Sequence, residues 1–509
     1  MYSANSIAPR WLGRMIAVGG FCLLTLACSP EDEDRTPAAP VAPSLATGSG
    51  SEDLIPLSRV PVPRPAGNII NRAAAVRLGK AFFWEAQVGG NGRIACATCH
   101  FVAGADGRHT AGSDGMVQAA NFNSVNANAN IAADNCTVTG GQQTTGRNTP
   151  TNVGAVFFRD LFHDGRANHR FNGLNPFGFT GNNTEGSLAS TIDNAGAASQ
   201  AVGPPNNPVE MSCNGRPFNG HNVPNGTLAT KLLARIPLGT QRVRKNDGDL
   251  GSLSNWPAKG LNTTYQAMIN AAFSPSVAGN AVNNFSAIWG QAIQAWEGKL
   301  IPDQTPLDQF LLGNTGALTE QQQRGLNRFT GKGGCTKCHL GGELSDATIA
   351  FVAASGLINE DGGDQGFHNI GVSPTNADLG RAATGPGGVA FSVSGSPFDR
   401  GAFKTPTLRN VKLTAPYFHF GQKQTLAQVV QFYADGGDFP NAGSKAKRIK
   451  PISFDADDKA ALVDFLTNAL TDCRVEKERA PFDHPSLPKP SGSGNLTGAV
   501  GRNGRGPCP

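Results

Sequence analysis

The stretch "IACATCHFVAG" (94–104) contains the pattern Cys-x-x-Cys-His, and "GGCTKCHLGGE" (333–343) repeats it. The chain has only 10 cysteines and 9 histidines in 509 residues, so chance does not explain two copies. This spacing suits c-type haem attachment, in which two thiols bind one porphyrin and the adjacent histidine ligates the iron. We therefore predict two covalently bound haem c groups, one on Cys96, Cys99 and His100 and one on Cys335, Cys338 and His339.

Two other kinds of site use paired cysteines. Zinc ribbons place their two Cys-x-x-Cys units about 15–20 residues apart, far closer than these two motifs. A redox dithiol of the thioredoxin type does not require a histidine after the second cysteine in both copies. The sequence therefore favours haem over zinc or a dithiol.

Composition limits the fold and the partners. Hydrophobic residues make up 39% and charged residues 16% of the chain, while Gly (64) and Pro (34) are abundant, so long loops should separate few regular elements. The length suggests two to three domains at about 150 residues each. The net charge of +5 is small and forms no basic stripe, which argues against nucleic acid as a partner.

The N-terminus is typical of an export signal. Arg10 and Arg14 precede a short apolar run, and small residues follow it. The run ends in "LTLACS", which resembles a bacterial lipobox with Cys28 as the lipidated residue, although Thr25 stands where Leu is usual. Ordinary cleavage nearby is the alternative. We expect a signal peptide over 1–28, a flexible linker over 29–60, and a periplasmic protein whose lipid anchor, if Cys28 carries one, lies in the outer membrane.

The remaining cysteines predict disulfides. Cys22 and Cys28 lie in the signal region, and four further cysteines lie outside the two haem motifs. In an exported protein four such thiols suggest two bridges. We predict the pairs Cys136–Cys213 and Cys473–Cys508, since each pair lies on one side of the expected domain boundary.

Helix signals surround both motifs. Helices are expected over 71–87 and 319–331, each leading into a motif, and over 284–300 and 454–470. Trp289 and Trp296 in the third of these helices should pack in a core. Because no strand alternation persists, we predict a mainly α fold with two cytochrome c-like domains, each binding one haem, and long loops, among them an Asn- and Gly-rich insertion near 180–225. We expect an N-terminal cytochrome c-like domain over 61–305, a C-terminal one over 306–484 and a loose tail over 485–509.

Several stretches between about residues 75 and 485 resemble, in the same order, the bacterial di-haem cytochrome c peroxidases and their MauG-type relatives. The matching stretches are "RLGKAFFWEAQ", "CATCH", "GRNTPTNVGAVFFRDLFHDGRA", "NPVEMS", "TPLDQFLLGN", "ALTEQQQRGLNRFTGKGGCTKCHLG", "GFHNIGV", "FKTPTLRNVKLTAPYFHFGQKQTLAQVVQFYADGG" and "FLTNALTDCRVEKERAPFDHPSL". The order of these stretches along the chain is much more specific than either motif alone.

The resemblance implies a peroxidatic haem on His100 and an electron-transfer haem on His339. It matches Glu210 of "NPVEMS" to the acid/base residue of the peroxide pocket, a role that peroxide cleavage requires. It also implies a calcium ion on Asn148 and the carbonyls of Thr414 and Pro416, where hard oxygen ligands suit Ca²⁺. The implied partners are hydrogen peroxide and an electron-donor cytochrome or a protein substrate, and a homodimer is among the expected assemblies.

Two positions bear on how the haems work. Tyr433 lies on the predicted buried face of a helix capped by Thr425, where the peroxidases of this family have Met and the MauG type has Tyr as iron ligand. A core tyrosine is the alternative, and His419 is a competing ligand with an equally good match to a residue near the haem propionates. His163 of "FHDGR" replaces the tryptophan that the family usually places between its haems, so electron transfer through this position differs from the family pattern.

Three functions compete. The first is a periplasmic peroxidase that reduces hydrogen peroxide with single electrons from a small cytochrome or another donor. The second is a MauG-like oxidase or oxygenase acting on a protein or organic substrate, which Tyr433 and the stretch "FNGLNPFG", similar to the rubber-oxygenase branch, favour. The third is a non-catalytic electron carrier, which Glu210 argues against.

Overall fold

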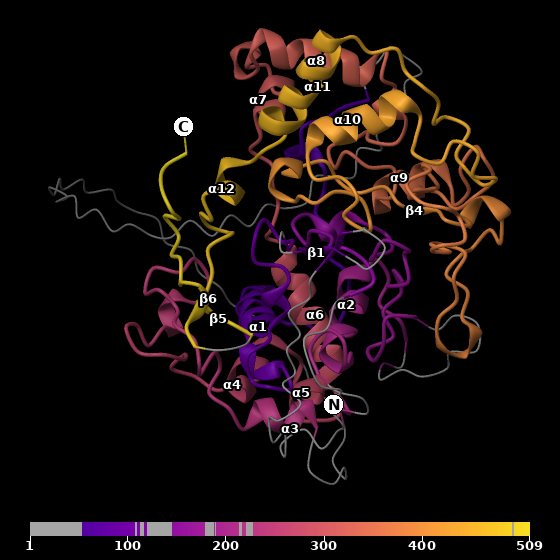
Figure 1. Ribbon diagram of the computed structural model, residues 1–509. Coiled ribbons are helices and arrows are strands. Elements are labelled where there is room, and N and C mark those ends of the chain that lie inside the picture. Colours follow the sequence, from indigo (N-terminus) through magenta and orange to yellow (C-terminus); the bar gives the residue numbers. More distant parts are fainter. Residues whose placement is uncertain are drawn as a thin grey trace, which may run out of the picture. The chain divides into compact units, whose positions relative to one another are not determined.

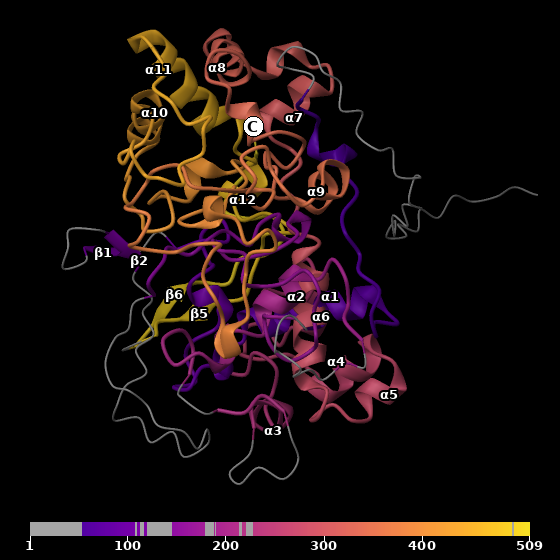
Figure 2. The same cartoon turned by 90° about the vertical axis from the view of Figure 1, so that its right-hand side faces the viewer.

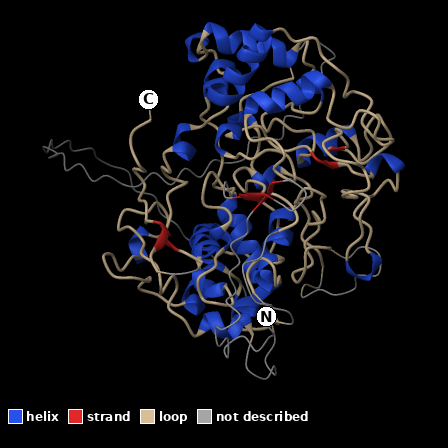
Figure 3. Ribbon diagram, viewed as in Figure 1, coloured by secondary structure: helices blue, strands red, loops and turns tan. Residues whose placement is uncertain are grey.

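Helices and loops make up nearly all of the structure, and its strands are short (Figure 3). The computed structural model describes residues 53–106, 109–111, 117–119, 145–178, 188, 190–212, 216–219, 227–490 and 493–508. The helices are α1 (Arg72–Trp84), α2 (Gly196–Ala201), α3 (Leu228–Leu233), α4 (Tyr265–Ala272), α5 (Pro275–Ala278), α6 (Phe285–Glu297), α7 (Pro306–Leu311), α8 (Glu320–Thr330), α9 (Ile349–Ser355), α10 (Leu426–Asp435), α11 (Ala456–Asp464) and α12 (Cys473–Glu476). The mainly α prediction is confirmed.

The strands of the described residues form three antiparallel pairs. They are β1 (His109–Ala111) with β2 (Val117–Ala119), β3 (Phe367–His368) with β4 (Phe403–Lys404), and β5 (Leu487–Pro488) with β6 (Asn495–Thr497). None of these pairs is large enough to organise a core by itself. Helix packing therefore sets the architecture.

The first helix pair consists of α1 and α6, which lie side by side (Figure 1). Asn71 caps α1 by accepting a hydrogen bond from the Ala74 amide at 3.0 Å. The helices approach closely because Gly79 has no side chain, and a Cβ there would lie 1.9 Å from the Ala292 carbonyl oxygen. Trp296, 3% exposed, packs beside this contact with its ring 4.7 Å from that of Phe83. The predicted helices over 71–87 and 284–300 are confirmed, as is the core position of Trp296.

The second helix pair repeats this arrangement with α8 and α11 (Figure 2). Thr319 and Gln322 form the predicted capping box at the start of α8, and Asp455 caps α11. A Cβ on Gly325 would lie 2.2 Å from the Ala461 carbonyl oxygen and 2.6 Å from the Phe465 Cβ. In each pair, the helix that leads into a haem motif carries a glycine. Through this glycine it contacts a helix from the end of the same half.

Separate hydrophobic cores surround the two pairs. One core combines α1, α4 and α6 with Leu487 from the C-terminal segment. Another core combines α8, α10 and α11 with Leu54. Among the described residues no helix is long and apolar enough to cross a membrane. The boundary predicted at 305/306 remains a prediction, although the two cores draw on different sides of it apart from Leu487 and Leu54.

The C-terminal segment differs from the loose tail predicted for 485–509. Leu487 is fully buried in the first core, and the Ser486 amide donates to the Arg242 carbonyl at 2.8 Å. Before them, His484 stacks on Trp84 with ring centroids 4.5 Å apart. The segment thus returns to the N-terminal half. The prediction was wrong because the burial partners of this Gly- and Pro-rich segment lie more than 200 residues away in sequence.

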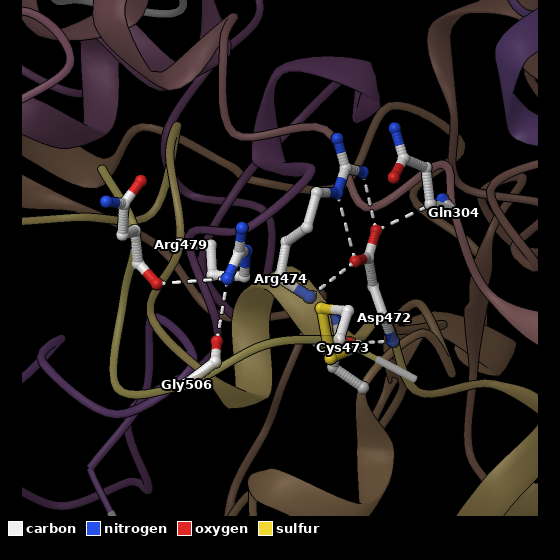
Figure 4. Close-up of a disulfide and its surroundings, with 9 residues drawn as sticks. Gln304, Asp472, Cys473, Arg474, Arg479 and Gly506 are labelled. Atoms are coloured by element: carbon white, nitrogen blue, oxygen red, sulfur yellow. Dashed lines mark hydrogen bonds and ion pairs between the residues drawn. A yellow bond between two sulfur atoms is a disulfide. The ribbon is translucent and has the colours of Figure 1, made fainter.

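The predicted disulfide Cys473–Cys508 is confirmed (Figure 4). Next to it, Asp472 accepts hydrogen bonds from the Gln304 amide at 3.1 Å and from the Arg474 guanidinium, and Arg479 donates to the Gly506 carbonyl at 2.7 Å. Cys136, Cys213 and the signal region lie outside the described residues.

The last part of the predicted flexible linker is folded. Leu54 is 5% exposed, Leu57 is 1% exposed, and the Leu57 amide donates to the Asp308 carboxylate at 2.8 Å. Two apolar residues therefore anchor the chain immediately before the first domain. The acidic and Pro-rich composition of the linker does not extend to them.

Candidate functional site

The first motif forms a tight turn, Cys96–Thr98, whose geometry is fixed by the Ala95 amide donating to the Thr98 hydroxyl at 2.9 Å. His100 follows, and its Nδ1 donates to the Gly104 carbonyl at 2.7 Å. The remaining ring nitrogen, Nε2, is therefore the one left to bind iron. Gly104 has a φ of +74°, and a Cβ there would lie 2.3 Å from the Asn152 side-chain oxygen. Glycine is required at this position.

A cavity of about 570 Å³ opens beside this motif. Its volume lies within the range of small-molecule and cofactor sites. Its walls bring together five residues that the sequence predicted for the first haem: Cys96, Cys99, His100, His163 and Glu210. These residues come from three separate segments between positions 96 and 210, so their convergence is a property of the fold.

Glu210 lies at the cavity wall on the segment after α2. Burial raises the pKa of its carboxyl, and nearby Arg166, which also lines the cavity, lowers it in part. A carboxyl with a raised pKa exchanges a proton more readily near neutral pH. The structure thus places Glu210 and His100 in the wall of the same cavity.

His163 lies in the same cavity wall and is neutral. Burial and the nearby Arg147 guanidinium lower its pKa to about 4. Its Nε2 donates to the Asn148 carbonyl at 2.9 Å, and the Asn148 amide in turn donates to the His419 carbonyl at 2.6 Å. His163 therefore begins a hydrogen-bonded path to His419 rather than an aromatic stack of the tryptophan kind.

The second motif has the same local design as the first. A turn at Cys335–Lys337 leads to His339, whose Nδ1 donates to the Leu344 carbonyl at 3.0 Å. Burial raises the pKa of the Cys335 thiol to about 12. Asp346 and His368, joined at 2.7 Å, have ligand atoms within 4.8 Å of the Cys338 sulfur.

Tyr433 lies next to the second motif. It belongs to α10, which begins at the predicted Thr425 cap. Burial raises the pKa of its phenol, and the nearby Cys338 and Cys335 raise it further. The residue is half-buried. The structure thus places the Tyr433 phenol close enough to interact electrostatically with both cysteines of the second motif.

His419 is 4% exposed and stacks on Phe403, with ring centroids 3.7 Å apart. Its ring lies 6.4 Å from that of His163, and burial lowers its pKa to about 3. Within the described residues its Nε2 is buried without a hydrogen-bond partner. A buried ring nitrogen of this kind is expected to donate a hydrogen bond to an acceptor that is not part of the protein chain.

The predicted calcium residues come together in part. The Asn148 side-chain amide contacts the Pro416 carbonyl at 2.6 Å, with the amide nitrogen toward the oxygen. A 180° turn of the amide would present its oxygen instead, which is the atom a calcium ion needs. The Thr414 hydroxyl donates to the Val411 carbonyl at 3.2 Å.

The donor set fits two c-type haems. Each motif provides two cysteines and a histidine with Nδ1 engaged on a backbone carbonyl, which is the usual arrangement around a metal-ligating histidine. A cavity lies beside the first motif, and the His419 Nε2 is a buried polar atom that has no partner among the residues the structure describes. Cys96, Cys99 and His100 would hold one haem, and Cys335, Cys338 and His339 the other.

Sequence reasoning missed two charged residues at this site. Glu297, at the end of α6, is 4% exposed and lines the cavity. Arg147 pairs with Asp164 at 2.5 Å and with Asp378 at 2.6 Å, and its guanidinium lies over the Phe403 ring. The sequence signal available for Glu297 was its position directly after Trp296, at the end of an apolar helix face. Arg147 gave no such signal, because its partners are too distant in sequence.

A family profile described as "Di-haem cytochrome c peroxidase" matches residues 73–316. Cytochrome-c peroxidase IdrP1 of Pseudomonas sp. (strain SCT) is 26% identical over 450 residues, covering 86% of this chain and 89% of its own length. Methylamine utilization protein MauG of Methylorubrum extorquens is 31% identical over 197 residues, covering 39% of this chain and 46% of its own length. A solved structure of a MauG-like protein associated with microbial copper homeostasis aligns with a TM-score of 0.49 at 22% identity, covering 84% of this chain and 95% of that one. Over residues 73–316 the chain is thus similar to the di-haem cytochrome c peroxidases, and the relatives that it resembles are named as cytochrome-c peroxidases and as MauG.

Proposed function

We propose that the protein is an exported, periplasmic peroxidase that reduces hydrogen peroxide to water at the first motif. In this proposal the second motif receives electrons one at a time from a small cytochrome or another donor. Similarity to the di-haem cytochrome c peroxidases supports the reaction class, and the two complete Cys-x-x-Cys-His motifs support the cofactors. Lipidation of Cys28 and a calcium ion at Asn148, Thr414 and Pro416 belong to the same proposal.

The observation that carries the proposal is the shared cavity of His100 and Glu210. Reduction of peroxide consumes two protons and two electrons per molecule and yields two waters. The haem would supply the electrons and the iron at which the O–O bond is cleaved. Glu210 would accept the proton from the oxygen that is bound first and return a proton to the oxygen that leaves, which its raised pKa favours.

Electrons have a path between the two motifs. His163 lines the first cavity, and its hydrogen bond to Asn148 continues to the His419 backbone at 2.6 Å. His419 stacks on Phe403 of β4. We propose that this path takes the place of the tryptophan found in relatives, and that it carries electrons without a radical on the bridging ring.

Glu210→Gln tests the proposal directly. The variant keeps the size of the side chain but cannot exchange a proton, so the rate of peroxide reduction should fall about 10²- to 10⁴-fold. The resting spectra of both haems should stay unchanged, because Glu210 is not expected to ligate iron. Glu320→Gln, an exposed carboxyl in the first turn of α8, is the matched control and should keep full activity. Equal rates for Glu210→Gln and the parent protein would refute this assignment.

A second candidate function is a MauG-like oxidase that uses peroxide to oxidise a protein or organic substrate. The position of Tyr433 beside Cys338 and Cys335 favours it, since a phenolate ligand stabilises the ferric and higher states of a haem.

We predict that Tyr433→Phe changes the spectrum and raises the potential of one haem only. Tyr417→Phe removes another partly buried phenol, on the edge of the second core, and should change neither haem. If Tyr433→Phe leaves every haem band in place, Tyr433 is a core residue and the peroxidase function gains support.

A further inference from the structure

Glu297 is a buried carboxyl in the wall of the first cavity. It is the last residue of α6 and is 4% exposed. Burial raises its pKa to about 8, and its hydrogen-bond partner is Asn152, whose side-chain amide donates to Oε1 at 3.2 Å. Burying a carboxyl with so few partners costs free energy, so its presence calls for a specific role.

Asn152 links this carboxyl to the first motif. Its backbone amide donates to the Gly104 carbonyl at 3.1 Å, and the same carbonyl accepts the His100 Nδ1 proton at 2.7 Å. The neighbouring Thr151 hydroxyl holds the Ala103 carbonyl at 2.6 Å. The loop that orients His100 is therefore fixed by Thr151 and Asn152, and Glu297 holds the Asn152 side chain from the other side.

The second helix pair shows what packing alone requires at this position. Gly79 meets Ala292 and Trp296 as Gly325 meets Ala461 and Phe465, so the residue equivalent to Glu297 is the one after Phe465. That residue is Leu466, 8% exposed in the second core. A leucine fills the place in one half, so the carboxyl in the other half is not needed for packing.

We propose that Glu297 is a positioning residue for His100: through Asn152 it holds the Gly104 carbonyl in line with His100 Nδ1, and it thereby sets the potential of the haem on the first motif. A firm hydrogen bond to Nδ1 makes the histidine a stronger electron donor to iron and favours the ferric state. The inference rests on the proposed function only in requiring that His100 carries a haem.

The test compares Glu297→Leu with Glu297→Gln in the full-length, haem-loaded protein, with the potential of each haem followed by optical spectra. Leucine cannot accept the Asn152 hydrogen bond, so the potential of one haem should rise while the other stays constant. The glutamine carbonyl can still accept it, so Glu297→Gln should behave like the parent. Glu297→Leu should also slow the peroxide reaction about 10- to 100-fold, as changes behind a ligating histidine typically do.

A shift of equal size in both variants would show that charge, not the hydrogen bond, sets the potential, and no shift in either would also overturn the proposal. If Glu297→Leu loads haem poorly, Asn152→Ala breaks the same link from its other side and should give the same shift. In the double variant the two shifts should not add. The potentials are measured without peroxide, so a protein without peroxidase activity would leave this test intact.

Discussion

His163 stands where the family resemblance implies a tryptophan. An imidazole is harder to oxidise than an indole, but it forms directional hydrogen bonds on both sides. Here burial keeps the ring neutral, with a pKa lowered to about 4, and its Nε2 proton is committed to the Asn148 carbonyl. His163 thus holds the Asn148 segment of its own half, and the Asn148 amide makes the contact with the other half by donating to the His419 carbonyl.

This environment predicts acid sensitivity. In the unfolded chain the histidine binds a proton below its usual pKa of 6.5, whereas in the folded protein it resists protonation down to about 4. Stability is therefore lost as the pH falls from 6.5 to 4, and above pH 7 the residue has little effect. Glutamine at this position keeps an N–H donor but does not titrate. The drop in unfolding free energy between pH 7 and 5 should be smaller in His163→Gln by about 1 to 2 kcal/mol, as measured by urea denaturation. Identical drops in both proteins would contradict the assignment.

Residues with local signals were predictable from sequence. Asn71, Thr319, Thr425 and Asp455 cap helices as expected, because a cap is satisfied within three residues of itself. The position of Tyr433 also follows from helical periodicity. Glu297 escaped prediction because its role depends on Asn152, whose distance from it in sequence no local pattern spans.

At the scale of elements, the two helix pairs explain how each motif is presented. Each motif follows a helix that packs through a glycine on a terminal helix of its half. This close contact fixes the direction in which the chain leaves the helix and enters the motif. Helix formers, capping residues and periodicity predicted α1, α6, α8 and α11, but not the glycine contacts, which are tertiary.

The glycine contacts predict two parallel variants. Gly79→Ala would place a Cβ 1.9 Å from the Ala292 carbonyl oxygen, and Gly325→Ala would place one 2.2 Å from that of Ala461. Each helix pair must separate, at a cost of about 1 to 3 kcal/mol or more. We expect each variant to attach less haem at its own motif, as measured by peptide mass spectrometry. Gly316→Ala, where the nearest atom lies 3.7 Å away, is the control, and equal losses at both motifs would refute the separate roles.

At the scale of the whole molecule, Arg381 connects segments that the predicted domain boundary separates. It is 2% exposed and donates to Asp364 at 2.7 Å, to Asp160 at 3.1 Å and to the Gly165 carbonyl at 3.0 Å. The last two contacts flank the segment that carries His163. Arg381 therefore fixes the position of the segment that carries His163 relative to the C-terminal half.

Arg381→Met should destabilise the protein by about 3 to 5 kcal/mol, because buried Asp160 and Asp364 lose their common partner. The expected result is a lower denaturation midpoint and slower electron transfer from the second haem to the first. Arg170→Met removes an exposed pair with Asp193 at 3.3 Å and should cost less than about 1 kcal/mol. If both variants unfold alike, the buried cluster does not hold the halves together.

The folded C-terminal segment and the residues before Val60 were not predictable, because their anchors are distant cores. Leu487 is a single apolar residue in polar, Gly- and Pro-rich surroundings, and Leu54 belongs to the short run Leu54–Leu57, so neither gives a periodic signal. Composition correctly predicted few regular elements. Composition could not show which apolar residue is buried in the core of the other half.

The most direct test of the central claim measures haem content and electron stoichiometry on one purified sample. A pyridine haemochrome assay should give two haem c per chain, and with a reduced small cytochrome as donor the protein should consume two electrons for each hydrogen peroxide that disappears. One haem per chain, or peroxide loss with release of oxygen and no oxidation of the donor, would contradict the claim that this protein is a di-haem peroxidase.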